Sequence, residues 1–206
     1  MASINWHANL ILYILNMDLE QDPIASILKA VAGILNRLAI PYFITGGIAA
    51  LKWGRVRSTV DIDLVVRLVP QKIDQLAESL LKIDKYAYVD KQAIKVAFEA
   101  KGEFNFIHGS SGVKVDFWVE KDNDLSRTHM ERRVKEEIEG EAVYFCTPED
   151  LILNKLAWHK DSGSALQLED VRSVLERQKN LDFEYLDKWS IVQGTKNVLE
   201  ELKQKP

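Results

Sequence analysis

The sequence contains one cysteine, no long apolar run and no excess of basic residues. A single thiol, Cys146, cannot close an internal disulfide, and it cannot build a cysteine-based zinc site. A reducing cytoplasm is therefore the expected location. The net charge is −4, so no basic field covers the whole surface, although a local basic groove for nucleic acid stays compatible with this balance.

The N-terminal segment also lacks the features of a targeting or membrane-spanning sequence. Its apolar run, residues 10–17, is too short to cross a bilayer, and no Lys or Arg precedes Lys29. A basic region and a small-residue cleavage site, which define a signal peptide, are both missing. We therefore expect a packing helix here and no membrane partner.

What the chain does have is the composition of an ordinary soluble protein of 206 residues, 47% hydrophobic and 28% charged. This length suits a catalytic domain with a helical appendage. The pattern becomes helical at Thr147, where a cap residue precedes Pro148. We predict an α/β core with an N-terminal helix over residues 1–146 and a helical subdomain over residues 147–206.

The remaining elements follow from periodicity and from turn residues. Helical spacing predicts helices over 24–38, 70–81, 147–161 and 166–178, with further helices to 202. The stretch 93–120 alternates in its apolar residues (Ile94, Val96 and Phe98 first) and predicts strands. Residues 132–146 resemble a hairpin that turns at 139–140, although 131–137 fit a helix equally well.

One stretch, residues 42–66, organises the chemistry. An apolar run ends at Gly46-Gly47, a short helical segment and a basic turn follow, and a second apolar run carries Asp61 and Asp63. Alternation places these two carboxylates on the same strand face, where they repel each other. A divalent cation would remove that repulsion. The glycine pair lets backbone approach a ligand, and the helix after it offers free N–H groups to a phosphate.

A third acid stands on another apolar strand. In the run VKVDFWVE, the side chains of Val113, Val115, Phe117 and Val119 share one face, and Asp116 lies on the other. Alone, Asp116 is most simply a solvent-facing aspartate. Together with the upstream pair it becomes a candidate third carboxylate.

The diglycine turn followed by R-x-T-x-D-I-D-L resembles the signature of the DNA polymerase β-like nucleotidyltransferase superfamily. The resemblance implies an α+β nucleotidyltransferase fold, in which a small mixed β-sheet flanked by helices precedes a C-terminal helical subdomain. It also implies a nucleoside triphosphate as substrate and Mg²⁺ or Mn²⁺ as cofactor. Asp61, Asp63 and Asp116 would hold the metal, with Asp116 also helping to deprotonate the acceptor. Gly46, Gly47 and Arg57 would bind the triphosphate, unless Arg57 is a surface arginine paired with an acid.

The segment from Thr147 to Ser190 is similar to the helical tail of bacterial nucleotidyltransferase-like proteins, which include toxins of type IV abortive-infection toxin–antitoxin systems. Lys155 matches a lysine that would bind nucleotide, and Asp170 matches an aspartate that would orient Lys155 or act in the proton path. The match departs from the toxins at His159-Lys160-Asp161 and in the Ser-Gly-Ser insertion before Asp170. Trp53 and Trp158 lie near enough to these motifs to line a base pocket.

Two hypotheses from different classes follow. The first is a nucleotidyltransferase that transfers a nucleoside monophosphate to a hydroxyl on tRNA, a protein or a small molecule, with an antitoxin protein as a further partner. The second is a catalytically inactive nucleotidyltransferase fold that acts as a binding module through a protein partner.

Overall fold

The computed structural model describes residues 23–138 and 140–204. The N-terminal packing helix expected around residues 10–17 lies outside this part of the chain. Over the described ranges, no helix combines the length and the apolar character that crossing a membrane would need.

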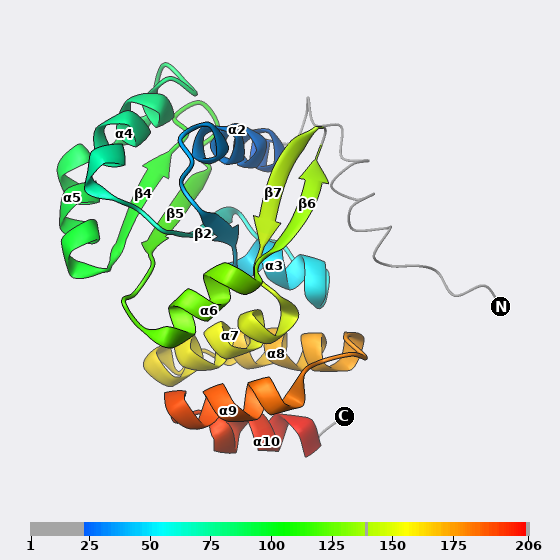
Figure 1. Cartoon of the computed structure of the whole chain (residues 1–206). Coiled ribbons are helices and arrows are strands. Elements are labelled where there is room, and N and C mark those ends of the chain that lie inside the picture. Colours follow the sequence, from blue (N-terminus) through cyan, green and yellow to red (C-terminus); the bar gives the residue numbers. More distant parts are fainter. Residues whose placement is uncertain (1–22, 139, 205–206) are drawn as a thin grey trace.

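The described chain forms one seven-stranded mixed sheet with the strand order β3-β4-β5-β2-β1-β7-β6 (Figure 1). The central pair, β2 and β5, runs parallel, and β1 pairs antiparallel with β2 and parallel with β7. The strands are β1 (Tyr42–Ile44), β2 (Asp61–Val66), β3 (Tyr88–Val89), β4 (Glu103–Ile107), β5 (Lys114–Val119), β6 (Val134–Ile138) and β7 (Glu141–Phe145).

Helices cover both faces of the sheet, and those after β7 pack together at one side of it (Figure 1). Their bounds are α2 (Pro23–Arg37), α3 (Gly46–Trp53), the short 3-10 helix η1 (Pro70–Lys72), α4 (Ile73–Leu81), α5 (Lys91–Ala100), α6 (Asp124–Arg132), α7 (Pro148–Ser162), α8 (Ala165–Arg177), α9 (Phe183–Gln193) and α10 (Lys196–Gln204).

Two apolar cores form because the sheet buries both of its faces. Residues of even number on β2 and odd number on β5, such as Leu64 and Phe117, pack with α2, α4 and α5 in the first core. The second core is formed by Phe43, by Val65, by Ala49, Ala50 and Trp53 of α3, and by apolar residues of α7–α10. The strand face that carries Asp61, Asp63 and Asp116 therefore turns toward the C-terminal helices.

The expected strand at residues 93–99 is wrong, because this segment is helix α5. The Asp90 side chain accepts a hydrogen bond from the Gln92 N–H and caps the helix, and Lys101 ends it in the left-handed conformation. Ile94 and Ala97 point inward at helical spacing, whereas Val96 is exposed. Over so short a run, apolar alternation does not distinguish a strand from an amphipathic helix.

The other elements agree with the sequence pattern. Strands β6 and β7 pair antiparallel, which confirms the hairpin, and the helical alternative for 131–137 holds only as far as Arg132. A small mixed sheet flanked by helices, with four helices following it, confirms the predicted fold class. The division into domains at residue 147 stays a prediction.

Candidate active site

The diglycine turn fits against the first acidic strand so closely that its first residue has to be glycine. Gly46 has φ +63°, and a Cβ built there would lie 1.8 Å from the Asp63 Oδ2 atom. The Thr45 N–H donates to the Asp63 carbonyl at 2.9 Å and holds the two segments together. Any side chain at position 46 would displace the Asp63 carboxylate.

The second glycine lies between that acid and the loop that leads back into the sheet. A Cβ at Gly47 would meet the Thr59 Oγ1 atom at 2.2 Å. The Gly47 N–H donates to Asp63 Oδ2 at 3.4 Å, so a carboxylate already sits at the N-terminus of α3. A helix N-terminus attracts negative groups of this kind, phosphate included.

The three acids predicted from the sequence are close together on one face of the parallel pair β2–β5. Asp63 and Asp116 are register partners, and Asp61 is the next residue on the same face. The pKa of Asp63 is raised, chiefly because burial disfavours its charged form, and the neighbouring charges of Asp116 and Asp61 add to the shift. The Gly47 N–H and the Lys155 ammonium act in the opposite direction.

These acids suit a hard divalent cation in donor type and in register, because Mg²⁺ and Mn²⁺ prefer carboxylate oxygens. Their side chains are not gathered around one point, however. Within residues 23–138 and 140–204, no group of three or more His, Cys, Asp or Glu side chains is placed to hold a metal ion. The Asp116 carboxylate instead accepts the Lys114 ammonium at 2.7 Å. The assignment of these three acids as metal ligands therefore stays a prediction.

A buried ion cluster lies on the C-terminal helices beside these acids. Lys155 Nζ on α7 is 2.9 Å from Asp170 Oδ2 on α8, and both side chains are almost fully buried. Arg57, from the loop before β2, donates Nε and Nη2 to the two carboxylate oxygens of Asp170, each at 3.0 Å. Asp170 thus links the lysine of the helical tail to the arginine of the signature loop.

Burial and charge pairing in this cluster shift the pKa values of Lys155 and Asp170. Burial lowers the pKa of Lys155 and outweighs its pairing with Asp170. Burial alone would raise the pKa of Asp170, but its hydrogen bonds from Arg57 and Lys155 prevail and lower it. Both of the roles considered for Arg57 required a nearby anion, and in this structure that anion is Asp170.

Three site features were missed from the sequence or placed wrongly. Lys114 contacts Asp116, and the strand alternation that put both on one face was a signal for it. Thr59 packs on Gly47, which no pattern indicated. The base-pocket prediction for Trp53 is wrong, because its ring is buried in the second core and its Nε1–H donates to the Cys146 carbonyl at 2.8 Å. Trp158 is half-buried, with the Lys155 ammonium 5.3 Å from its ring centroid.

Comparison with known proteins adds a family and a fold. The model of a family described as "Nucleotidyltransferase of unknown function (DUF6036)" matches residues 24–205. No curated protein matches the sequence.

Several solved structures are similar. A crystal structure of ANT(2")-Ia in complex with adenylyl-2"-tobramycin matches with a TM-score of 0.56 and 15% identity, over 84% of this chain and 97% of that chain. A solution structure of the antibiotic-resistance factor ANT(2'')-Ia matches with a TM-score of 0.55 and 15% identity, over 85% and 94%. An antigenic nucleotidyltransferase-like protein from Paracoccidioides brasiliensis is 21% identical over 86% and 91%, with a TM-score of 0.49. At 15% identity, the likeness to the two ANT(2'')-Ia structures establishes the fold alone.

Proposed function

This chain belongs to the nucleotidyltransferase family DUF6036, and we propose that it transfers a nucleoside monophosphate from a nucleoside triphosphate to a hydroxyl acceptor, with Mg²⁺ or Mn²⁺ as cofactor. The observation that carries the proposal is the register of β2 and β5. It brings Asp61, Asp63 and Asp116 to one face, beside the diglycine turn. Burial and the charges of Asp116 and Asp61 raise the pKa of Asp63, which does not stabilise the fold, so the grouping of these acids favours a chemical role.

In the reaction, the acceptor hydroxyl oxygen forms a bond to the α-phosphorus, and the bond from that phosphorus to the β-phosphate breaks, releasing pyrophosphate. Asp116 accepts the hydroxyl proton. Asp61, Asp63 and Asp116 would hold the metal, which when bound neutralises the phosphates and activates the hydroxyl.

The groups around the acids bind the triphosphate. The N-terminus of α3 at Gly46 and Gly47 presents N–H groups to its phosphates. Arg57 adds positive charge beside the glycine pair, since its Nη2 atom lies 3.5 Å from the position that a Cβ would take at Gly47. Lys155 adds a second positive charge, and Asp170, which bonds to both, fixes their positions. Asp170 therefore positions these two cations, and we assign it no direct contact with the reacting atoms.

The finer assignments rest on the family resemblance. The acceptor is a hydroxyl of tRNA, a protein or a small molecule. The toxin-related version, with an antitoxin partner in a bacterial cytoplasm, is supported by the contact between Lys155 and Asp170, the two positions that the toxin resemblance assigns. It predicts that induced expression arrests growth and that Asp63→Asn removes the arrest.

Calorimetry tests the proposal directly. Each nucleoside triphosphate is titrated into the protein with Mg²⁺, and one of them is expected to bind in a manner that Asp61→Asn and Asp63→Asn abolish. Asp74→Asn is the matched control, because Asp74 is exposed on α4 and pairs only with Lys91 among the ion pairs of the described chain. If no triphosphate binds, or if binding survives both substitutions, the proposal is wrong.

A labelling experiment separates the enzyme from the binding module. The protein is incubated with α-labelled triphosphate and cell extract, and a labelled product that Asp116→Ala eliminates is expected. A partner protein that co-purifies, with no label transferred, would favour the binding module.

A further inference from the structure

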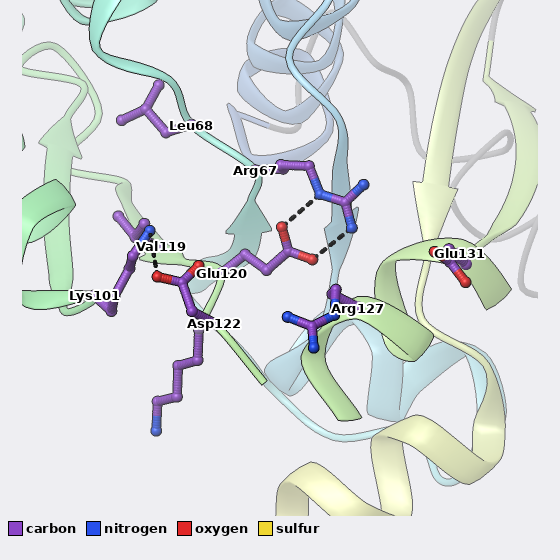
Figure 2. Close-up of a pocket in the computed structure, with 9 residues that line it drawn as sticks. Arg67, Leu68, Lys101, Val119, Glu120, Asp122, Arg127 and Glu131 are labelled. Atoms are coloured by element: carbon purple, nitrogen blue, oxygen red, sulfur yellow. Dashed lines mark hydrogen bonds and ion pairs between the residues drawn. The ribbon is translucent and has the colours of Figure 1, made fainter. Parts of the chain in front are cut away.

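A polar cavity of about 280 Å³ lies where β2 and β5 end, and the function proposed above leaves it without a role. Figure 2 shows its central contact, in which the Arg67 guanidinium donates two hydrogen bonds to the Glu120 carboxylate, at 2.5 and 2.7 Å. Arg127 and Glu131, from α6, line another side of the cavity. Glu120 is buried although it is charged, which requires a partner such as Arg67.

The Arg67–Glu120 pair continues the two lines of side chains that carry the acids, whereas Leu68 and Val119 line the cavity from the side of the first core. Asp116 and Glu120 are four residues apart on one line of alternating side chains, and Asp63 and Arg67 are four apart on the neighbouring strand. The Glu120 N–H donates to the Val66 carbonyl at 2.9 Å, so the pairing of the two strands continues to this point. At a rise of about 3.3 Å per residue, the cavity begins about 13 Å from the acids.

Trp118 lies between them, on the same line of side chains. Its ring centroid is 6.2 Å from that of Trp158 on α7, and both rings are half-buried. The Trp118 Nε1 atom is buried and has no hydrogen-bond partner among the described residues. A buried indole N–H normally has an acceptor, so a ligand oxygen at this position would supply a missing bond.

The charges around the cavity indicate the chemistry of such a ligand. Cations and carboxylates alternate, since Arg67 pairs with Glu120 and Lys101 pairs with Asp122 at 3.3 Å. With Lys121, Arg127 and Glu131 included, the lining holds four cations and three carboxylates. A polyphosphate would therefore meet three carboxylates, and a compact polycation would meet four cations. A hydroxyl group both donates and accepts, so a ligand with many hydroxyls can bond to both signs of charge.

We propose that the cavity and Trp118 bind the acceptor substrate, and that this acceptor is a polyhydroxylated small molecule of at least two ring units. The inference rests on the proposed function, which supplies a hydroxyl acceptor. One ring presents its hydroxyl at Asp116 and lies against Trp118, and the distal ring occupies the cavity at Arg67 and Glu120. The separation of about 13 Å is too long for a single sugar ring.

The test follows the indole N–H signals of the five tryptophans in ¹⁵N-labelled protein. Trp118→Phe identifies the Trp118 signal. The probes are maltotriose and a panel of neutral and amino-substituted di- and trisaccharides, with unfractionated tRNA as the contrast. We expect at least one saccharide to shift the Trp118 signal saturably, and tRNA to leave it unchanged.

Variants then connect the shift to the cavity. Arg67→Met and Glu120→Gln should raise the Kd of the saccharide at least tenfold. Glu131→Gln, which keeps the Arg67–Glu120 pair, should raise it at least threefold, so the test does not depend on variants that fail to fold. Asp74→Asn should change nothing. A saccharide panel that never shifts the Trp118 signal, a Kd indifferent to these variants, or a shift with tRNA alone would overturn the proposal.

Triphosphate calorimetry on the same samples keeps the two proposals apart. The cavity variants should bind the triphosphate with unchanged Kd, because none of them touches the acids or the diglycine turn. If the wild-type protein binds triphosphate but no saccharide, only the acceptor assignment fails. If it binds no triphosphate, the proposed function fails, and the saccharide titration still decides whether the cavity is a sugar site.

Discussion

The two faces of the parallel pair β2–β5 differ in composition, because one is apolar and the other is rich in charged side chains. On the face toward α2, α4 and α5, the side chains of Ile62, Leu64, Val115 and Phe117 are fully buried, and Phe117 stacks on Phe104 with centroids 4.8 Å apart. On the face toward the C-terminal helices, the same two strands carry three aspartates and Lys114 beside only two apolar side chains, Val65 and Trp118.

This contrast separates residues that hold the fold from residues that the fold must accommodate. Burial of apolar side chains is the main favourable term in folding. Asp63 has the opposite effect, because its burial raises its pKa and so penalises the charged form at neutral pH. The apolar face therefore supplies the stability that lets the acidic face keep its carboxylates together.

The largest effect is expected on the apolar face. Phe117→Ala removes a fully buried ring and leaves a cavity, so it should lower the free energy of unfolding by about 3–5 kcal/mol. Urea denaturation measures this. On the next residue, which faces the other way and is half-buried, Trp118→Phe should cost less than about 1.5 kcal/mol. An equal loss of unfolding free energy in the two variants would show that the apolar face does not contribute more stability than the other face.

The buried ion cluster of Lys155, Asp170 and Arg57 lies beside the acidic face, and breaking it should give the next largest loss of stability. Asp170→Asn leaves the buried Lys155 ammonium and the Arg57 guanidinium without their carboxylate, which should cost about 3 kcal/mol in urea denaturation.

The neighbouring position provides the control for that prediction. Glu169 pairs with Arg55 at 2.5 Å on the surface, with exposed side-chain fractions of 49% and 39%, and Glu169→Gln should cost less than about 1 kcal/mol. A similar loss of unfolding free energy in both variants would mean that the buried ion cluster stabilises the protein no more than the surface pair does.

Asp63→Asn should stabilise the protein by about 1 kcal/mol at pH 7 while it abolishes triphosphate binding, as exchanges at active sites often do. The sign follows from the raised pKa. The folded state holds the Asp63 proton more tightly than the unfolded state, so the wild type loses stability as the pH rises through the folded pKa. The advantage of the variant should therefore disappear as the pH falls toward the unfolded value near 3.8. Denaturation at several pH values measures it, and a variant less stable than wild type at pH 7 would contradict the prediction.

Much of the fold could be predicted because strong periodicity coincided with unambiguous caps. Pro23, Pro70 and Pro148 each begin a helical segment, and the alternation in β2 and β5 fixed which residues are buried. The error at α5 arose because Ile94, Val96 and Phe98 alternate as in a strand but also fit an amphipathic helix. Only the capping residue Asp90 indicated the helix. Strand order was out of reach, because pairing β2 with β5 depends on contacts between segments about fifty residues apart.

The candidate site was predictable to the extent that its residues lie on regular elements. Strand alternation alone placed Asp61, Asp63 and Asp116 on their faces. The bond from Arg57 to Asp170 joins a loop without regular structure to α8, 113 residues later, and no local pattern encodes such a contact. The cavity beyond β2 and β5 is likewise created by tertiary packing of α6 against the strand ends.

The smallest effect is expected at Lys114, the one basic residue on the acidic face of β5. Its ammonium bonds to Asp116, and that hydrogen bond, followed by the charges of Asp116, Asp61 and Asp63, raises its pKa, so it is positively charged at neutral pH. A divalent cation would have to compete with this ammonium for the Asp116 carboxylate. Lys114→Met should therefore tighten Mn²⁺ binding about threefold, close to 0.7 kcal/mol, in a titration followed by electron paramagnetic resonance.

Lys114→Arg, which keeps the charge, should bind Mn²⁺ as the wild type does. Lys91→Met removes a lysine that pairs with Asp74 instead, and it should also leave the affinity unchanged. Weaker Mn²⁺ binding in Lys114→Met would show that the lysine organises the acids for the metal rather than competing with it. Lys114 would then hold the acids together, as Lys155 and Arg57 hold the carboxylate of Asp170 in the buried ion cluster.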